Sequence, residues 1–99
     1  MNNEQILIKA IKERKFIDFY YEDKPIRKVA PHAIYRSSTG KENLDAYQYD
    51  GYSEKGNLPA WRIFTLNKMD RISVLDENFQ ERDDYKTNSD RYRDYIYKI

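Results

Sequence analysis

One helical segment at the start of this chain is followed by five short β-rich segments, and polar turns separate most of them. The expected strands are centred on residues 16–21, 27–36, 44–49, 61–66 and 72–75. The turns and the longer loop between them are rich in Gly, Pro, Ser, Asn and Asp. A single helix and so many closely spaced strands predict a small, strongly bent β-barrel.

The ends of these segments carry further signals. Asn2 and Gln5 resemble a helix capping box, and apolar residues at helical spacing predict a helix that ends near Lys15. Pro31 interrupts the second expected strand, which indicates an edge position or a bulge.

Residues 1–77 therefore form the expected barrel domain, and residues 78–99 a C-terminal extension packed on it. The fold class is mainly β with an N-terminal helix: a five-stranded barrel of the SH3 or Sm type. The extension is highly charged after Phe79. A short helix or irregular tail is the favoured reading of its end, and a closing strand over residues 95–99 is the alternative.

Composition limits the function classes. The 99 residues contain no cysteine, which excludes disulfides and thiolate metal sites and fits a reducing compartment. No run approaches the roughly 20 apolar residues of a membrane span, and the N-terminus does not resemble a secretory signal. The expected location is cytoplasmic, with no membrane partner.

Catalysis is not expected. The sequence has no glycine-rich phosphate loop, metal-ligand spacing or nucleophile elbow. Its paired acids, at 22–23 and 83–84, lie in polar stretches typical of solvent-exposed surface. We expect a binding module without enzymatic activity, cofactor or metal.

Cationic and aromatic residues gather between residues 27 and 66. Residues 24–36 carry four Lys or Arg and no Asp or Glu, although the net charge of the chain is only +1. Such a chain is not typical of a strong duplex-DNA binder, which needs many phosphate contacts. Cations beside flat aromatic side chains suit a phosphate-bearing or base-bearing ligand.

The ordered motifs resemble the WYL domain over roughly residues 5–77. They are Ala10-Ile11, Phe19-Tyr20-Tyr21, Arg27…Pro31-His32, Leu44-x-Ala46-Tyr47 and Arg62-x-Phe64-x-Leu66. The name-giving Trp-Tyr-Leu tripeptide falls on Glu42-Asn43-Leu44, so only its Leu is kept.

This resemblance implies an Sm-like barrel that senses a ligand in bacterial or phage transcription regulation. Single-stranded nucleic acid or a nucleotide is the implied ligand class. WYL domains usually follow a DNA-binding winged helix, which these residues do not contain, so a standalone WYL protein is expected.

The family pattern points to Arg27, His32, Tyr47 and Arg62 as ligand-binding residues. Arg62 is the strongest candidate, since a partly buried Arg needs an anionic or planar partner. Its alternative role is a structural salt bridge with Asp18, Asp45 or Asp50.

Two aromatic residues complete the predicted site. Tyr49 shares a strand face with Tyr47 and could form a stacking platform, although packing within the barrel is the alternative. Trp61 lies either in the core or at the rim of the 51–59 loop. His32, the only histidine, is equally consistent with a ligand contact and with a hydrogen-bonded strand histidine.

The residues leave two functions open. The barrel binds a short single-stranded nucleic acid or nucleotide and signals to a protein partner. Alternatively, its Tyr-rich strands and extension form a protein-interaction or homo-oligomerisation module, for which aromatic and Arg enrichment is equally suitable. The sequence does not distinguish the ligand, the partner or the oligomeric state.

Overall fold

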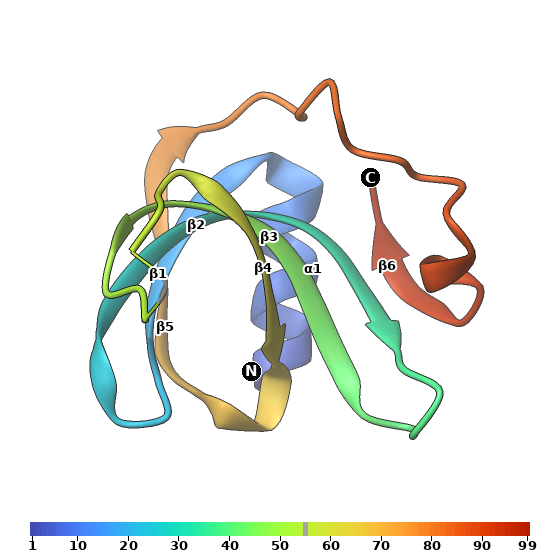
Figure 1. Cartoon of the computed structure of the whole chain (residues 1–99), viewed down its shortest axis with the longest axis horizontal. Helices are drawn as coiled ribbons and strands as arrows, with labels where there is room; N and C mark the ends of the chain where they lie inside the picture. The colour runs from blue at the N-terminus through green and yellow to red at the C-terminus, as the bar shows by residue number, and fades with distance from the viewer. Residues whose placement is uncertain (55) are drawn as a thin grey trace.

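The computed structural model describes residues 1–54 and 56–99, and it is mainly β with an N-terminal helix, as the sequence predicts. The helix is followed by six strands and two single 3-10 turns, η1 and η2 (Figure 1). The elements are α1 (Asn3–Glu13), β1 (Lys15–Tyr21), β2 (Lys24–Arg36), β3 (Glu42–Gly51), β4 (Ala60–Thr65), η1 (Leu66–Lys68), β5 (Met69–Asn78), η2 (Asp90–Tyr92) and β6 (Tyr95–Lys98). No helix in the described residues is long and apolar enough to cross a membrane.

The helix α1 has the expected capping box. The Asn2 side chain accepts from the backbone N–H of Gln5, and the Gln5 side chain accepts from the backbone N–H of Asn2. The helix ends at Glu13, two residues before the expected Lys15, because Arg14 adopts a left-handed conformation and starts the turn into β1.

The five barrel strands pair in the order β4-β3-β2-β1-β5, and every strand pair is antiparallel. The long strand β2 is central, and its register with β3 shifts between Pro31 and Ala33. This bulge confirms one of the two positions expected for a strand proline, which cannot donate to the ladder.

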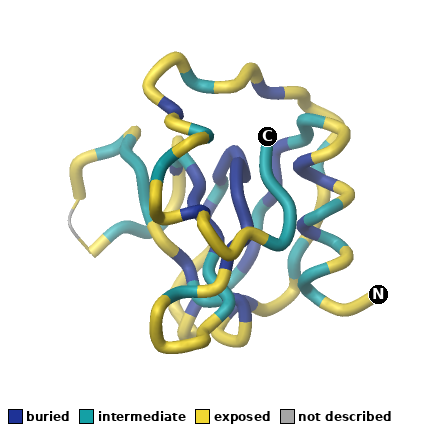
Figure 2. The backbone as a smooth tube through the Cα atoms, turned by 90° about the vertical axis from the view of Figure 1, so that its right-hand side faces the viewer, coloured by how far each residue is buried: buried dark blue, intermediate teal, exposed yellow. Residues whose placement is uncertain are grey.

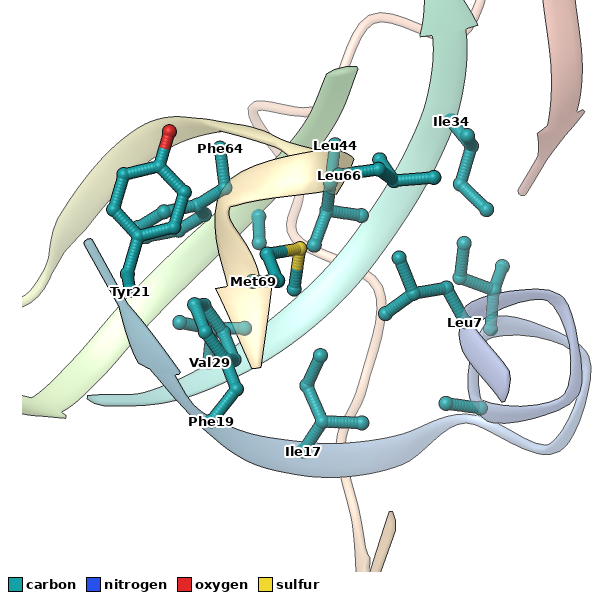
Figure 3. Close-up of a cluster of buried hydrophobic side chains, with 13 residues drawn as sticks. Leu7, Ile17, Phe19, Tyr21, Val29, Ile34, Leu44, Phe64, Leu66 and Met69 are labelled. Atoms are coloured by element: carbon teal, nitrogen blue, oxygen red, sulfur yellow. The ribbon is translucent and has the colours of Figure 1, made fainter. Parts of the chain in front are cut away.

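The main core fills the barrel interior. Figure 3 shows Leu7 of α1 at one end of this core and Tyr21 and Phe64 at the other. The helix therefore closes one end of the barrel. At the opposite end the core finishes in aromatic rings, next to the 51–59 loop.

Residues 78–99 cover the outer face of the sheet. Phe79, Tyr85 and Tyr92 are buried there in two smaller apolar clusters, whereas the segments between these anchors are a mixture of exposed and half-buried residues (Figure 2). The chain then returns as β6, which pairs with the end of β2 (Figure 1).

The end of the extension differs from the favoured expectation of a helix or irregular tail. Only the single 3-10 turn η2 forms, and the alternative, a closing strand, is present as β6. The Tyr95-Ile96-Tyr97 sequence suits a strand, and the free edge at the end of β2 supplies its hydrogen-bonding partner.

Candidate ligand-binding site

The six residues that the sequence singles out divide into two groups in the structure. Arg27 and Arg62 contact the 51–59 loop. The other four lie on the outer side of the sheet, beside or beneath the C-terminal extension: His32, Tyr47, Tyr49 and Trp61. We call the first group, together with Gln48, Tyr52 and Ser53, the arginine site, and the second group the aromatic face.

Arg27 is a buried cation inside an aromatic cage. Only 7% of the residue is exposed. Its guanidinium carbon lies 5.1, 5.2 and 5.5 Å from the ring centroids of Tyr21, Tyr52 and Phe64. Its Nε atom has no hydrogen-bond partner, and no carboxylate of the described residues lies within salt-bridge distance.

The strand pattern explains why Arg27 points inward. Arg27 and Val29 are two residues apart on β2, so both side chains face the barrel interior, whereas Lys28 faces outward and pairs with Glu77. Strand alternation accounts for this division between Arg27 and Lys28. Cation–π contacts lower the cost of burying the guanidinium but do not replace hydrogen bonds to its N–H groups.

Gly51 allows the loop to close over Arg27. It lies opposite Arg27 in the β2–β3 register and has a φ of +95°, a conformation that favours glycine. The next residue, Tyr52, donates its backbone N–H to the Ile26 carbonyl oxygen at 3.1 Å. The Tyr52 ring is thereby placed against the Arg27 guanidinium.

Gln48 fixes the same loop from the barrel side. Its Nε2 donates to the backbone oxygens of Asp50 at 3.1 Å and Tyr52 at 2.8 Å. The residue is fully buried, and its Oε1 has no partner within the described residues. Within residues 1–54 and 56–99, the two side-chain atoms that are buried without a partner both lie in the arginine site: the Arg27 donor and the Gln48 acceptor.

Arg62 completes the arginine site from β4. Its guanidinium donates to the Trp61 carbonyl oxygen at 3.1 Å and to Ser53 Oγ at 3.2 Å. It forms no salt bridge with Asp18, Asp45 or Asp50 in the structure.

Asp45 is instead occupied by three other groups. It accepts from the hydroxyls of Tyr35 and Tyr92 and pairs with Arg91 at 2.9 Å. The structural alternative proposed for Arg62 is therefore not present in this conformation.

His32 has the hydrogen-bonded environment of a structural histidine. Its Nε2 accepts from the backbone N–H of Arg82 at 3.2 Å, so Nδ1 carries the proton and donates to the Ala30 carbonyl oxygen at 2.9 Å. Burial lowers the pKa of His32 from its ordinary value of 6.5. Both ring nitrogens are used within the chain, which favours the strand-histidine alternative over a ligand contact.

The aromatic face is occupied by the extension. The Arg82 guanidinium carbon lies 3.9 Å from the Tyr47 ring centroid. Trp61 donates from its indole nitrogen to Asp84 and stacks on Tyr85. Tyr49, at the margin, is 38% exposed. A ligand that stacks on Tyr47 or Trp61 would have to displace these contacts.

Several residues of these surfaces were not among the six that the sequence singles out, and Gln48 and Arg82 illustrate why. Gln48 follows Leu44 and Ala46 at strand spacing, so a polar side chain on the core face of β3 could have been recognised. Arg82 lies in a charged stretch without periodicity, and no sequence signal places it on Tyr47.

The chain is similar in fold to part of a solved structure, the proteasome accessory factor B/C (PafBC) of Arthrobacter aurescens. The TM-score is 0.70 at 22% sequence identity, and the match covers 87% of this chain and 13% of that chain. The sequence matches no family model, and no curated protein matches it. The structural similarity supports a WYL-like fold for this chain.

Proposed function

We propose that this protein is a non-enzymatic regulatory module that binds a short single-stranded nucleic acid or a nucleotide-like anion at the arginine site. The observation that carries the proposal is the Arg27 guanidinium, which is buried and has no carboxylate partner among the described residues. An unpaired buried charge is costly, and an anionic ligand would supply its missing partner.

The surroundings of Arg27 support a ligand that is both anionic and flat. A guanidinium binds phosphate through a planar set of N–H donors. The Tyr52 ring, which is partly exposed beside it, offers a surface on which a base can stack. Arg62 adds a second cation to the site. Its guanidinium contacts Ser53, the loop residue that follows Tyr52.

The likeness to PafBC supports the fold of this proposal only. This chain spans 13% of the length of that protein, so the role of the whole protein as a proteasome accessory factor is not transferred. In the proposal, the ligand-bound state is passed to a protein partner in the cytoplasm, a reducing compartment that suits a chain without disulfides.

A second candidate is a protein-interaction or homo-oligomerisation module without a nucleic-acid ligand. Two half-exposed apolar side chains favour it, Ile63 with 51% and Tyr95 with 54% of the residue exposed. Aromatic and aliphatic side chains of this kind are common in the centres of protein interfaces.

Fluorescence anisotropy with labelled single-stranded DNA, single-stranded RNA and duplex DNA distinguishes the two candidates. The proposal predicts binding to a single strand that weakens as salt rises and is reduced by Arg62→Ala. Binding to none of the three nucleic acids would reject the nucleic-acid proposal and leave the protein-interaction module.

A further inference from the structure

The free edge of β4 presents unpaired backbone groups in one short stretch. Among the strands of the described residues, β4 pairs only with β3, and its alternate residues direct their N–H and C=O groups away from that partner. Side chains bond to the Trp61 carbonyl and to the Thr65 N–H. These bonds show that the odd-numbered residues of β4 direct their backbone groups toward the free edge. Ile63 lies between Trp61 and Thr65, and its backbone N–H and C=O groups also point toward the free edge.

Both ends of this edge are capped by side chains. The Arg62 guanidinium donates to the Trp61 carbonyl oxygen at 3.1 Å, and the Thr65 N–H donates to the Tyr21 hydroxyl at 2.9 Å. No hydrogen bond from the described residues reaches the Ile63 N–H or C=O on this side. Capped ends limit pairing to a short segment, since long open edges promote aggregation.

A pocket of about 460 Å³ lies beside the uncapped residue. It is lined by Asp45, Trp61, Arg62, Ile63 and Arg91. Asp45 already accepts three hydrogen bonds and pairs with Arg91, so it is compensated within the chain. Arg62 lacks a carboxylate partner among the described residues, which leaves an uncompensated positive charge at the pocket.

We infer that this edge binds an extended peptide segment of a partner protein, with an apolar residue opposite Ile63 and an acidic residue next to it. The central peptide residue exchanges two backbone hydrogen bonds with Ile63, as in strand addition to a sheet edge. Its side chain lies on the same face as Ile63 and Trp61. The side chains of the two adjacent peptide residues lie on the opposite face, beside Arg62, where a carboxylate is favoured.

The test is an NMR titration of the isotope-labelled full chain with a labelled six-residue peptide of alternating Glu and Val. Two matched peptides serve as controls. One replaces each Glu by Lys, and the other carries an N-methyl group on the central Val amide. The Glu–Val peptide should shift the Ile63 amide signal and slow the exchange of that amide hydrogen with water. Each control peptide should bind roughly tenfold more weakly.

A pair of protein variants locates the site. Ile63→Lys should weaken binding of the Glu–Val peptide by about tenfold or more, because a charge on an edge opposes strand pairing. Val74→Lys places the same charge at a half-exposed aliphatic residue of β5, the other edge strand, and should leave binding unchanged.

Three outcomes would overturn the inference. They are no shift at Ile63, equal binding of all three peptides, or equal effects of the two variants. Light scattering of the protein alone tests the competing occupant. A dimer that Ile63→Lys dissociates would assign the edge to a second copy of the chain instead. Arg62 takes part in both proposals, but the Ile63 amide shift and the N-methyl control depend on the β4 edge and not on Arg27, so failure of peptide binding is distinguishable from failure of the nucleic-acid proposal.

Discussion

The backbone N–H of Arg82 donates to Nε2 of His32, and this 3.2 Å hydrogen bond joins the C-terminal extension to the centre of β2. Because Nδ1 of the same ring donates to Ala30, the bond requires a neutral imidazole. Trp61 and Tyr85 pack against the ring and keep it from water. His32 therefore links two parts of the fold.

The first prediction concerns pH. Burial lowers the pKa of His32, so below pH 6.5 the unfolded chain binds a proton that the folded chain resists. The free energy of unfolding should fall as pH drops below 6.5, by at most about 1.4 kcal/mol per pH unit. Urea unfolding between pH 7.5 and 5.5 measures this slope. His32 is the only histidine, so His32→Gln should flatten it; an unchanged slope in the variant would contradict the assignment.

The second prediction concerns Asp45, which is buried beneath the extension. Its carboxylate accepts from Tyr35 and Tyr92, and burial of both hydroxyls raises their pKa values. Asp45→Ala leaves these groups without an acceptor and should cost roughly 3 kcal/mol of unfolding free energy. Arg91→Ala, at a half-exposed partner, should cost less than about 1 kcal/mol. Thermal and urea unfolding test the difference. Equal losses of unfolding free energy would show that the hydrogen bonds of Asp45 to the two tyrosines add little to stability.

A third prediction compares two glycines with positive φ. A Cβ at Gly51 would collide with the backbone oxygen of Ile26, whereas one at Gly40 would meet no atom within 4 Å. Gly40→Ala should cost about 1 kcal/mol from backbone strain alone. Gly51→Ala should cost clearly more and disturb the Tyr52 signals in NMR spectra. Similar costs for both variants would show that the loop does not close over Arg27 as described.

A fourth prediction tests whether the extension is part of the folded unit. Tyr85 is buried against His32 and Trp61, whereas Tyr95 is half-exposed. Tyr85→Ala should lower the free energy of unfolding by roughly 3 kcal/mol. Tyr95→Ala should change it by less than about 1 kcal/mol. Equally small effects would indicate that the extension contributes little to stability.

The barrel could be predicted from the sequence because each strand carries its own local signal. The β-rich segments, the Asn2–Gln5 capping box and the strand-breaking Pro31 all appear in the structure as expected. The end of the extension could not be predicted in the same way. Whether Tyr95-Ile96-Tyr97 forms a strand depends on the free edge of β2, which only the assembled fold supplies.

The candidate site was predictable in part. Strand alternation separates Arg27 from Lys28, and the structure places them on opposite faces. The covering of the aromatic face was not predictable, because it depends on the extension. Arg82 and Tyr85 reach the aromatic face from a segment without periodic pattern, so nothing in the sequence indicates that they occupy it.

A matched pair of variants tests whether Arg27 binds an anionic strand. Arg27→Met and Lys28→Met each remove one positive charge from adjacent residues of β2, so their effects on non-specific attraction are alike. Methionine retains the apolar stem, and removing an unpaired buried charge should leave the folded state at least as stable.

The measurement is anisotropy of a short labelled single strand with both variants at two salt concentrations. Arg27→Met should weaken binding by about tenfold or more, because it removes charge-assisted hydrogen bonds. Lys28→Met should have only a small, salt-dependent effect. Equal effects of the two variants, or single-strand binding that survives in Arg27→Met, would contradict the claim that the buried arginine is the ligand site.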